Sequence, residues 1–260
     1  MRTLFVCFFS ILFSFHAFAD KNPDPRSSRK SAQATRVNTA PKINGIADDS
    51  IWESITSVSD FIQYLPIYNA PASFRTDVKI AYDDYAIYIL AQMYDPHPDS
   101  ILRQLGLRDE EHLNADMFSI EFDTYNNQLD AYSFTITASG VQIDSRESDE
   151  TYDAVWESET RITHDGWVAE LKIPYSALRF ARTSPQLWGM EIIRSIRRYR
   201  ETDQWSSHCY CLPPFPCHGG NLASGSPNVY VNGLQKGRIG DPVNCGSKCA
   251  TGSPNVFVND

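Results

Sequence analysis

Arginine and aromatic side chains crowd together near residue 200, in a pattern that could bind a sugar. Close to Glu191 the chain carries Arg194, Arg197, Arg198, Tyr199, Arg200 and Trp205. Flat aromatic faces stack on the C–H groups of a pyranose ring, and charged planar side chains bind hydroxyls in pairs. In a strand, alternation would send Arg197 and Arg198 to opposite faces, so at most one of them could share a site with Glu191. A solvated edge strand with ion pairs is the alternative interpretation.

Glu121 and Glu191 suggest a different chemistry. Glycoside hydrolases use two carboxyl groups that flank the bond to be cleaved, at a separation that sets the stereochemical outcome. The sequence does not fix the separation of these two residues. A glycoside hydrolase is therefore an alternative to a non-catalytic binding protein.

Cysteine and glycine divide the chain into two parts. Residues 20–208 contain no cysteine, whereas the following glycine-rich part holds Cys209, Cys211, Cys217, Cys245 and Cys249. We place a domain boundary near Trp205 to His208. In an exported chain these cysteines could form disulfides, although five leave one unpaired, and together with histidine they could instead bind a metal.

The N-terminus has the pattern of a secretory signal peptide. Arg2 precedes an apolar run from Leu4 to Phe15, and the small residues Ala17 and Ala19 follow. We expect residues 1–19 to be the signal and the mature chain to be exported to the periplasm, the outer surface or the medium. No later stretch is long and apolar enough to span a membrane. Residues 20–40 are rich in Ser, Arg, Lys and Pro and are expected to form a flexible leader.

The charge of the chain argues against a nucleic-acid partner. The sequence has 23 Lys and Arg against 32 Asp and Glu, which gives a net charge of −9. Binding to nucleic acid needs clustered positive charge that displaces counterions from the phosphates. The expected partner is instead an oligosaccharide or polysaccharide, on the basis of the aromatic and arginine residues near residue 200.

The elements that must position these residues are short strands. Residues 155–161 and 167–173 alternate apolar and polar side chains on either side of Asp165-Gly166, which predicts a β-hairpin. Similar patterns predict a hairpin over 76–93, a pair over 116–122 and 131–137, and strands over 141–144 and 188–198. Residues 42–55 contain an Asn-Gly turn and a short helical turn whose Trp52 is expected in the core. The fold class is therefore all-β, an antiparallel β-sandwich.

Five segments of the first part resemble the family 9 carbohydrate-binding module. They read KINGIADDSIW, DVKIAYDDYAIYILAQMYD, NADMFSIEFDTYNN, DGWVAELKIPYSAL and RRYRETDQWS, and the resemblance covers residues 41–206. It implies a jelly-roll-like sandwich that binds sugar without catalysis, and such modules are often attached to glycoside hydrolases. A role accessory to glycan degradation would follow.

This resemblance also implies particular site residues. Trp205 stands where a sugar-clamping tryptophan of the family would fall, whereas residues 100–114, where we would look for a second one, contain no tryptophan. The expected carbohydrate-binding set is Trp205, Arg197, Arg198, Tyr199, Glu191 and Trp156. Asp95, Asp116 and Asp123 lie at strand ends where such modules can hold calcium, although acidic residues at strand ends can also be solvated turns.

The C-terminal part, residues 207–260, resembles the PAAR-repeat proteins. GSPNVYVNG at 225–233 returns as GSPNVFVND at 252–260, and RIGDPV lies between the two copies. The resemblance implies a small β segment that holds zinc and caps the spike of a contractile injection system or phage tail. His208, His218 and Cys245 match the metal positions of the family, with Cys249 or Cys217 as the fourth ligand. A spike-tip protein that carries the sandwich is thus a second functional hypothesis, with a spike protein as its partner.

Overall fold

The computed structural model describes residues 30–127 and 129–206 and, beyond them, the backbone of four two-residue strands. The expected signal peptide, residues 1–19, lies outside these ranges. Within the described ranges no helix is long and apolar enough to cross a membrane. The helical elements that they contain are single 3-10 turns: η2 (Ser50–Ser54), η3 (Pro98–Ser100), η4 (Tyr175–Ala177) and η5 (Arg197–Tyr199).

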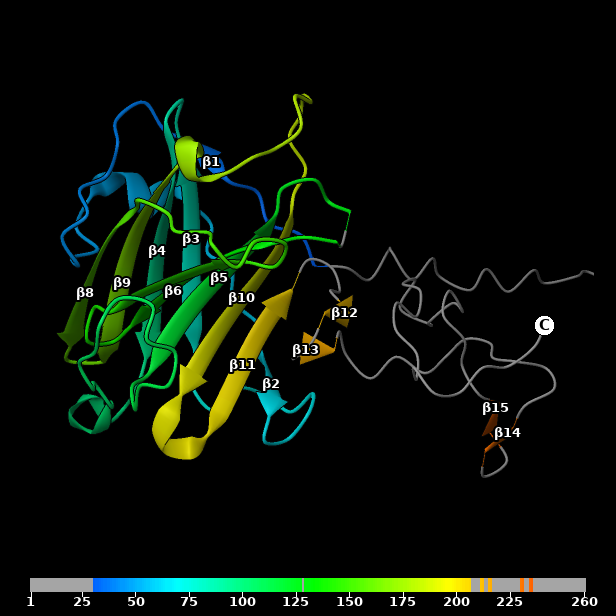
Figure 1. Ribbon diagram of the computed structural model, residues 1–260. Helices are drawn as coiled ribbons and strands as arrows, with labels where there is room; N and C mark the ends of the chain where they lie inside the picture. Colours follow the sequence, from blue (N-terminus) through cyan, green and yellow to red (C-terminus); the bar gives the residue numbers. More distant parts are fainter. Residues whose placement is uncertain are drawn as a thin grey trace, which may run out of the picture.

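Two sheets face each other and form a β-sandwich (Figure 1). The five-stranded sheet has the order β1 (Thr35–Arg36), β3 (Thr76–Tyr82), β4 (Ala86–Tyr94), β9 (Gly166–Pro174) and β8 (Glu157–Thr163). The six-stranded sheet has the order β2 (Ile62–Leu65), β11 (Glu201–Ser206), β10 (Gly189–Ile196), β5 (Met117–Asp123), β6 (Tyr132–Thr137) and β7 (Gln142–Arg146). Neighbouring strands are antiparallel except for β1 and β3. The predicted fold class is confirmed.

Four further short strands lie in the C-terminal part. β12 (Cys211–Leu212) pairs with β13 (Phe215–Pro216), and β14 (Tyr230–Val231) pairs with β15 (Leu234–Gln235). None of these four strands joins either sheet of the sandwich. All strands of the two sheets therefore come from residues 35–206.

The alternating side chains that predicted the strands fill the space between the sheets. The inward positions of the main strands carry Val78, Ile89, Met93, Phe118, Ile120, Phe134, Ile136, Trp167, Leu171 and Ile192, all fully buried. On the outer face of the five-stranded sheet, Trp52 packs with Tyr88, Leu90 and Val168 in a second cluster. Trp52 is 2% exposed, so its expected place in a core is confirmed.

The predicted hairpins form, and the turn of one of them requires glycine. β8 and β9 pair from Glu157 opposite Lys172 to Thr163 opposite Gly166, across the turn residues His164 and Asp165. Gly166 has φ +148°, and a Cβ at this position would lie 2.0 Å from the carbonyl oxygen of Met93 on the next strand. No other residue fits there without moving the backbone, because only glycine lacks a Cβ.

Three features of the sandwich differ from the sequence predictions. Residues 201–206 form the strand β11, which pairs with both β10 and β2, although the last strand was expected to end near Arg198. Arg197 and Arg198 belong to the turn η5, so they do not alternate as they would in a strand. The expected flexible leader contains β1, which pairs with β3 at Ala81 and Tyr82.

Arg194 joins the two sheets from within the core. It lies on β10 in the six-stranded sheet, is fully buried, and donates to the carbonyl oxygens of Arg75 (2.9 Å) and Tyr94 (2.7 Å) on the five-stranded sheet. It also donates to the hydroxyl of Thr76 (3.1 Å). Burial lowers the pKa of Arg194 to about 10, and nearby carboxylates, first that of Asp203, oppose this effect. The guanidinium therefore stays charged at neutral pH.

Asp203 lies directly opposite Arg194 in the β10–β11 ladder and is 0% exposed. Neither of its carboxylate oxygens has a hydrogen-bond donor in the described structure. Burial raises the pKa of Asp203 to about 7, and the neighbouring carboxylate of Glu201 adds to this increase. An ionised carboxylate without donors is costly to bury, so the protonated form is favoured in the folded state.

We predict that deletion of residues 207–260 leaves the sandwich folded. The two sheets take no strand from the deleted part, so the thermal midpoint should fall by less than about 10 °C. A larger fall would correspond to roughly 3 kcal/mol or more of lost contact in a domain of this size. Calorimetry of the full and shortened chains makes the comparison, and such a fall would show that the C-terminal part belongs to the same folding unit.

We predict that Asp203→Asn makes stability less dependent on pH. Because Asp203 has a raised pKa in the folded state, it binds a proton that the unfolded chain has lost, and its contribution to stability decreases as the pH rises from about 4 to about 7. Between pH 5 and pH 8 the thermal midpoint of the variant should therefore fall less than that of the unmodified protein. The exposed Asp99→Asn is the control and should keep the original profile. Parallel profiles for Asp203→Asn would contradict the assignment.

Candidate functional site

The six residues expected to bind sugar do not lie together. Arg197, Arg198 and Tyr199 form η5, at the turn between β10 and β11. Glu191 and Trp205 lie at the other end of these two strands, and they point to opposite faces because Trp205 pairs with Ile192 rather than with Glu191. The structure therefore does not bring these six residues together in one place.

Trp156 is a structural residue. It is 5% exposed, its ring contacts Phe134 at a centroid distance of 5.5 Å, and its indole Nε1 donates to Asp144 at 2.9 Å. Asp144 also accepts hydrogen bonds from Arg108 and from the backbone N–H of Ala154. The expected role of Trp156 at a sugar-binding surface is not compatible with this burial.

Arg198 and Asp95 form an ion pair rather than parts of ligand sites. Both nitrogens of the guanidinium terminus contact the Asp95 carboxylate, at 2.6 and 2.8 Å. Burial alone would raise the pKa of Asp95, but this contact holds it below its ordinary value. The Arg198 guanidinium also lies 4.6 Å from the ring centroid of Tyr199 and 5.5 Å from that of Phe74. The arginine therefore fixes η5 to the end of β4.

The three aspartates expected to bind calcium do not form one group. Asp116 precedes β5 and Asp123 ends it, so the length of the strand separates them, and Asp95 is paired with Arg198. Asp116 accepts the backbone N–H of Arg197 at 3.0 Å. The described residues contain no group of three or more His, Cys, Asp or Glu side chains that could hold a metal. The four expected zinc ligands, His208, His218, Cys245 and Cys249, lie outside the described residues.

Glu121 and Glu191 do lie directly opposite each other, on β5 and β10. They point to the outer face of the six-stranded sheet, because the alternating residues Ile120 and Ile192 point to the core. Burial raises the pKa of Glu121 to about 7 and that of Glu191 to about 8, where the charge of Glu121 contributes as well. Neither residue lines either of the two pockets described below.

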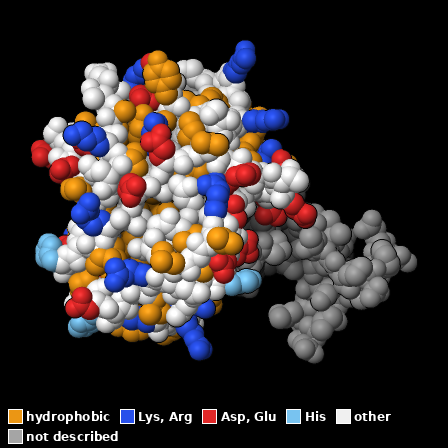
Figure 2. All heavy atoms as spheres, turned by 60° about the vertical axis from the view of Figure 1, so that its left-hand side comes forward, with side chains coloured by type: hydrophobic (Ala, Val, Ile, Leu, Met, Phe, Trp, Pro, Cys, Tyr) orange, Lys and Arg blue, Asp and Glu red, His pale blue; other side chains and the backbone are white. Residues whose placement is uncertain are grey.

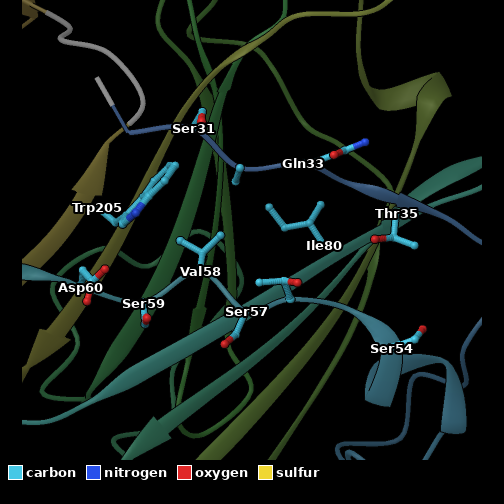
Figure 3. Close-up of a pocket in the computed structure, with 12 residues that line it drawn as sticks. Ser31, Gln33, Thr35, Ser54, Ser57, Val58, Ser59, Asp60, Ile80 and Trp205 are labelled. Carbon is cyan, nitrogen blue, oxygen red and sulfur yellow. The ribbon is translucent and has the colours of Figure 1, made fainter. Parts of the chain in front are cut away.

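The first pocket, here called the Trp205 pocket, has a volume of about 430 Å³ and lies beside the edge of β3 (Figure 3). Two segments that lie far apart in the sequence, 31–35 and 54–60, form its walls, and the indole of Trp205 lies on one side of it. The lining is rich in groups that can hydrogen-bond to a sugar: Ser31, Gln33, Thr35, Ser54, Thr56, Ser57, Ser59 and Asp60. Trp205 is only 4% exposed, so it is a buried wall rather than the expected open platform.

The second pocket, here called the Trp188 pocket, is larger, at about 820 Å³. The hairpin between β3 and β4, the segment after η4 and residues 183–188 surround it. Its lining contains a continuous row of aromatic rings: Phe122 contacts Trp188 at 5.8 Å, Trp188 contacts Phe180 at 5.3 Å, and Phe180 contacts Tyr175 at 5.6 Å between centroids. Trp188, Phe180 and Tyr175 are only partly buried.

Polar groups of the Trp188 pocket are held in fixed positions. Gln186 donates to the carbonyl oxygens of Ala181 and Thr183, both at 2.8 Å, and accepts the indole N–H of Trp188 at 3.1 Å. Asp83 accepts hydrogen bonds from the N–H groups of Tyr85 and Ala86 and from the Tyr88 hydroxyl. Burial would raise the pKa of Asp83, but these donors lower it below its ordinary value.

Trp188, Phe180 and Tyr175 were not among the site residues expected from the sequence. They could have been found as three aromatic residues within the irregular segment that links β9 to β10, because aromatic rings in such a segment are often partly exposed.

On the face shown in Figure 2, Lys and Arg side chains are scattered among Asp and Glu and do not gather into a single patch. This face therefore carries no single cationic patch of the kind that binds a polyanion.

Solved structures share this fold. A proposed carbohydrate-binding protein from Bacteroides uniformis is 12% identical, with a TM-score of 0.54 over 69% of this chain and 90% of that one. Two structures of a family 9 carbohydrate-binding module from Caldicellulosiruptor kristjanssonii also match. The complex with cellotriose is 19% identical over 68% and 85% of the two chains, with a TM-score of 0.48. The glucose complex is 18% identical over 68% and 87%, with a TM-score of 0.49.

Two protein families match the sequence, and no match was found among curated proteins. The PAAR motif matches residues 193–260, a range that includes β11 and the C-terminal part. The carbohydrate family 9 binding domain-like family matches residues 43–199, which is more than half of the chain and includes most strands of the sandwich. The resemblances predicted from the sequence are therefore confirmed, and the chain belongs to the carbohydrate family 9 binding domain-like family.

Proposed function

We propose that this chain is an exported, non-catalytic carbohydrate-binding protein whose sandwich binds a glycan in the Trp188 pocket. The observation that carries the proposal is the row of aromatic rings from Phe122 through Trp188 and Phe180 to Tyr175, which lines a hollow of about 820 Å³. Aromatic faces provide the apolar contact that sugar rings need, and fixed polar groups at the margin provide hydrogen bonds. Membership of the family supports the same function.

Several features support binding without catalysis. Asp83, a carboxylate that lines the pocket, is occupied by three donors and has a lowered pKa, so it is poorly suited to donate a proton. The adjacent carboxyl groups of Glu121 and Glu191 lie on the outer face of a sheet and do not line this pocket. The apolar run from Leu4 to Phe15 supports export of the chain. An exported binding module of this kind would assist the degradation of glycans by other proteins.

We predict that Trp188→Ala weakens glycan binding at least tenfold, equivalent to about 1.4 kcal/mol, because it removes the central ring of the row. Isothermal titration with glucose, cello-oligosaccharides and a panel of plant and microbial glycans measures the effect. Cellotriose and glucose are the ligands in the two Caldicellulosiruptor kristjanssonii structures. Thermal unfolding of each variant checks that the sandwich remains folded.

Tyr199→Ala is the matched control for this prediction. Tyr199 is an aromatic residue of η5 with 47% of its surface exposed, and it belonged to the site expected from the sequence. Its removal should leave glycan affinity unchanged. Loss of affinity in Tyr199→Ala but not in Trp188→Ala would place the site at η5, and the absence of binding to any glycan would reject the proposed function.

The match to the PAAR motif favours a second function for the C-terminal part, zinc binding and attachment to a spike protein. Structural zinc is typically held by a set of two histidines and two cysteines. The expected ligands of this part are such a set: His208, His218, Cys245 and Cys249. Zinc would then stabilise this small glycine-rich part, which contains few residues able to form a core. In this alternative the partner would be the spike protein of a contractile injection system or phage tail.

We predict about one zinc ion for each chain purified at neutral pH without chelators. Elemental analysis measures it, and Cys245→Ser should lower the zinc content because it removes a thiolate ligand. Cys211→Ser is the control, since Cys211 is not among the expected ligands. Zinc-free protein, or equal loss of zinc in both variants, would contradict this assignment of ligands.

A further inference from the structure

The segment Ser31–Arg36, here called the strap, lies between the two pockets. Ala32 and Gln33 of the strap line both the Trp205 pocket and the Trp188 pocket, and so does Ile80 of β3. Figure 3 shows the strap running past Ile80, with Trp205 near its Ser31 end. The two pockets are therefore neighbouring parts of one depression that the strap divides.

The floor of this depression is continuous and apolar. Trp205 and Ile80 line the first pocket, and Ile80, Ile87, Met190 and Phe122 line the second. All of these residues belong to the same core cluster between the two sheets. With the strap displaced, the floor would extend without interruption from Trp205 to the aromatic row beside Met190.

Ala34 of the strap packs against the core cluster, and the polar contacts of the strap lie at its two ends. At one end the Lys30 ammonium donates to the carbonyl oxygen of Asp60, which lies in the wall of the Trp205 pocket. At the other end Arg36 and Asp84 form an ion pair at 2.6 Å, with 54% and 71% of their side chains exposed. Next to it, the N–H of Val37 donates to Tyr82 at 2.9 Å, beside the two-residue ladder of β1 and β3. The Arg36–Asp84 pair is exposed, so it contributes little to stability and is weakened by salt, whereas the backbone contacts of Val37 and β1 hold this end more firmly.

The charges around the depression restrict its ligand. The lining of the two pockets includes the carboxylates Asp60, Asp83 and Asp84 and contains no Lys or Arg among the described residues. Two cations lie nearby: Arg36 is paired with Asp84, and Lys30 donates to the carbonyl oxygen of Asp60. Uronate or sulfate groups would be repelled here, whereas a neutral sugar would find hydroxyl and amide partners.

We propose that the strap determines the length of the neutral oligosaccharide that the sandwich binds. With the strap in place, the Trp188 pocket holds a short ligand or a chain end. With the strap displaced, one longer chain lies across the shared floor and reaches the hydroxyl-lined Trp205 pocket. This inference rests on the proposed carbohydrate-binding function and adds the residues that limit the ligand.

The test compares the affinities of cellobiose and cellohexaose for the full chain and for two strap variants. Lys30→Ala combined with Arg36→Ala removes the side-chain contact at each end of the strap. Val37→Pro removes the backbone N–H that bonds to Tyr82, and its ring remains compatible with extended backbone at Arg36. Arg161→Ala, an exposed arginine of β8, is the control for the loss of charge. Hydrogen exchange of residues 31–37 reports whether the strap has opened.

We expect the ratio of cellohexaose to cellobiose affinity to rise at least about fivefold in both strap variants and to stay unchanged in Arg161→Ala. Higher salt should raise the ratio in the unmodified protein, because it weakens the Arg36–Asp84 pair. An unchanged ratio in variants whose strap exchanges faster would overturn the inference. A strap that stays protected in both variants would also overturn it, because these contacts would then not hold it.

The same measurements separate this inference from the proposed function. If the unmodified protein binds the oligomers and the ratio does not respond to strap opening, only the inference about the strap is wrong. If the unmodified protein binds neither these nor other glycans while its strap exchanges normally, the proposed function is wrong and the inference falls with it.

Discussion

The structure depends on one buried cation, Arg194, that joins the two sheets. Its guanidinium satisfies the carbonyl oxygens of Arg75 and Tyr94 on the opposite sheet, while Asp203 faces it across the ladder of its own sheet. Replacing Arg194 would leave these two carbonyl oxygens as buried acceptors without their donor, which costs far more than the loss of a surface contact. The relative position of the sheets is therefore fixed by a specific polar contact as well as by the apolar core.

Similar polar contacts engage several of the charged residues near residue 200. Arg198 is committed to Asp95 and is covered by Phe74 and Tyr199, and the backbone of Arg197 is bonded to Asp116. These contacts hold η5 against the neighbouring strands. The Arg198 side chain is thus used to neutralise a buried carboxylate within the sandwich.

The two pockets are built from segments that the sheets hold at their edges and ends. Residues 31–35 and 54–60 lie along the edge of β3, and residues 183–188 lie at the start of β10. Such connecting segments carry the binding residues of many proteins, because a rigid scaffold can support loops of different sequence. Here the sheets provide the scaffold, and the aromatic row and the strap lie largely on the segments that the sheets support.

The sequence by itself determined the hairpins and the fold class. Alternation fixed the strands 76–82, 86–94, 157–163 and 166–174, and the glycine at 166 fixed one turn, because period-two patterns and turn chemistry are local properties. Only the tertiary structure decided that Trp205 points inward, since alternation does not say which face of a strand meets the core, and its register against Ile192 does. The tertiary structure also decided where the pockets lie. Only the packing of the two sheets brings together the separate segments that carry Ser31, Ser57, Trp188 and Trp205.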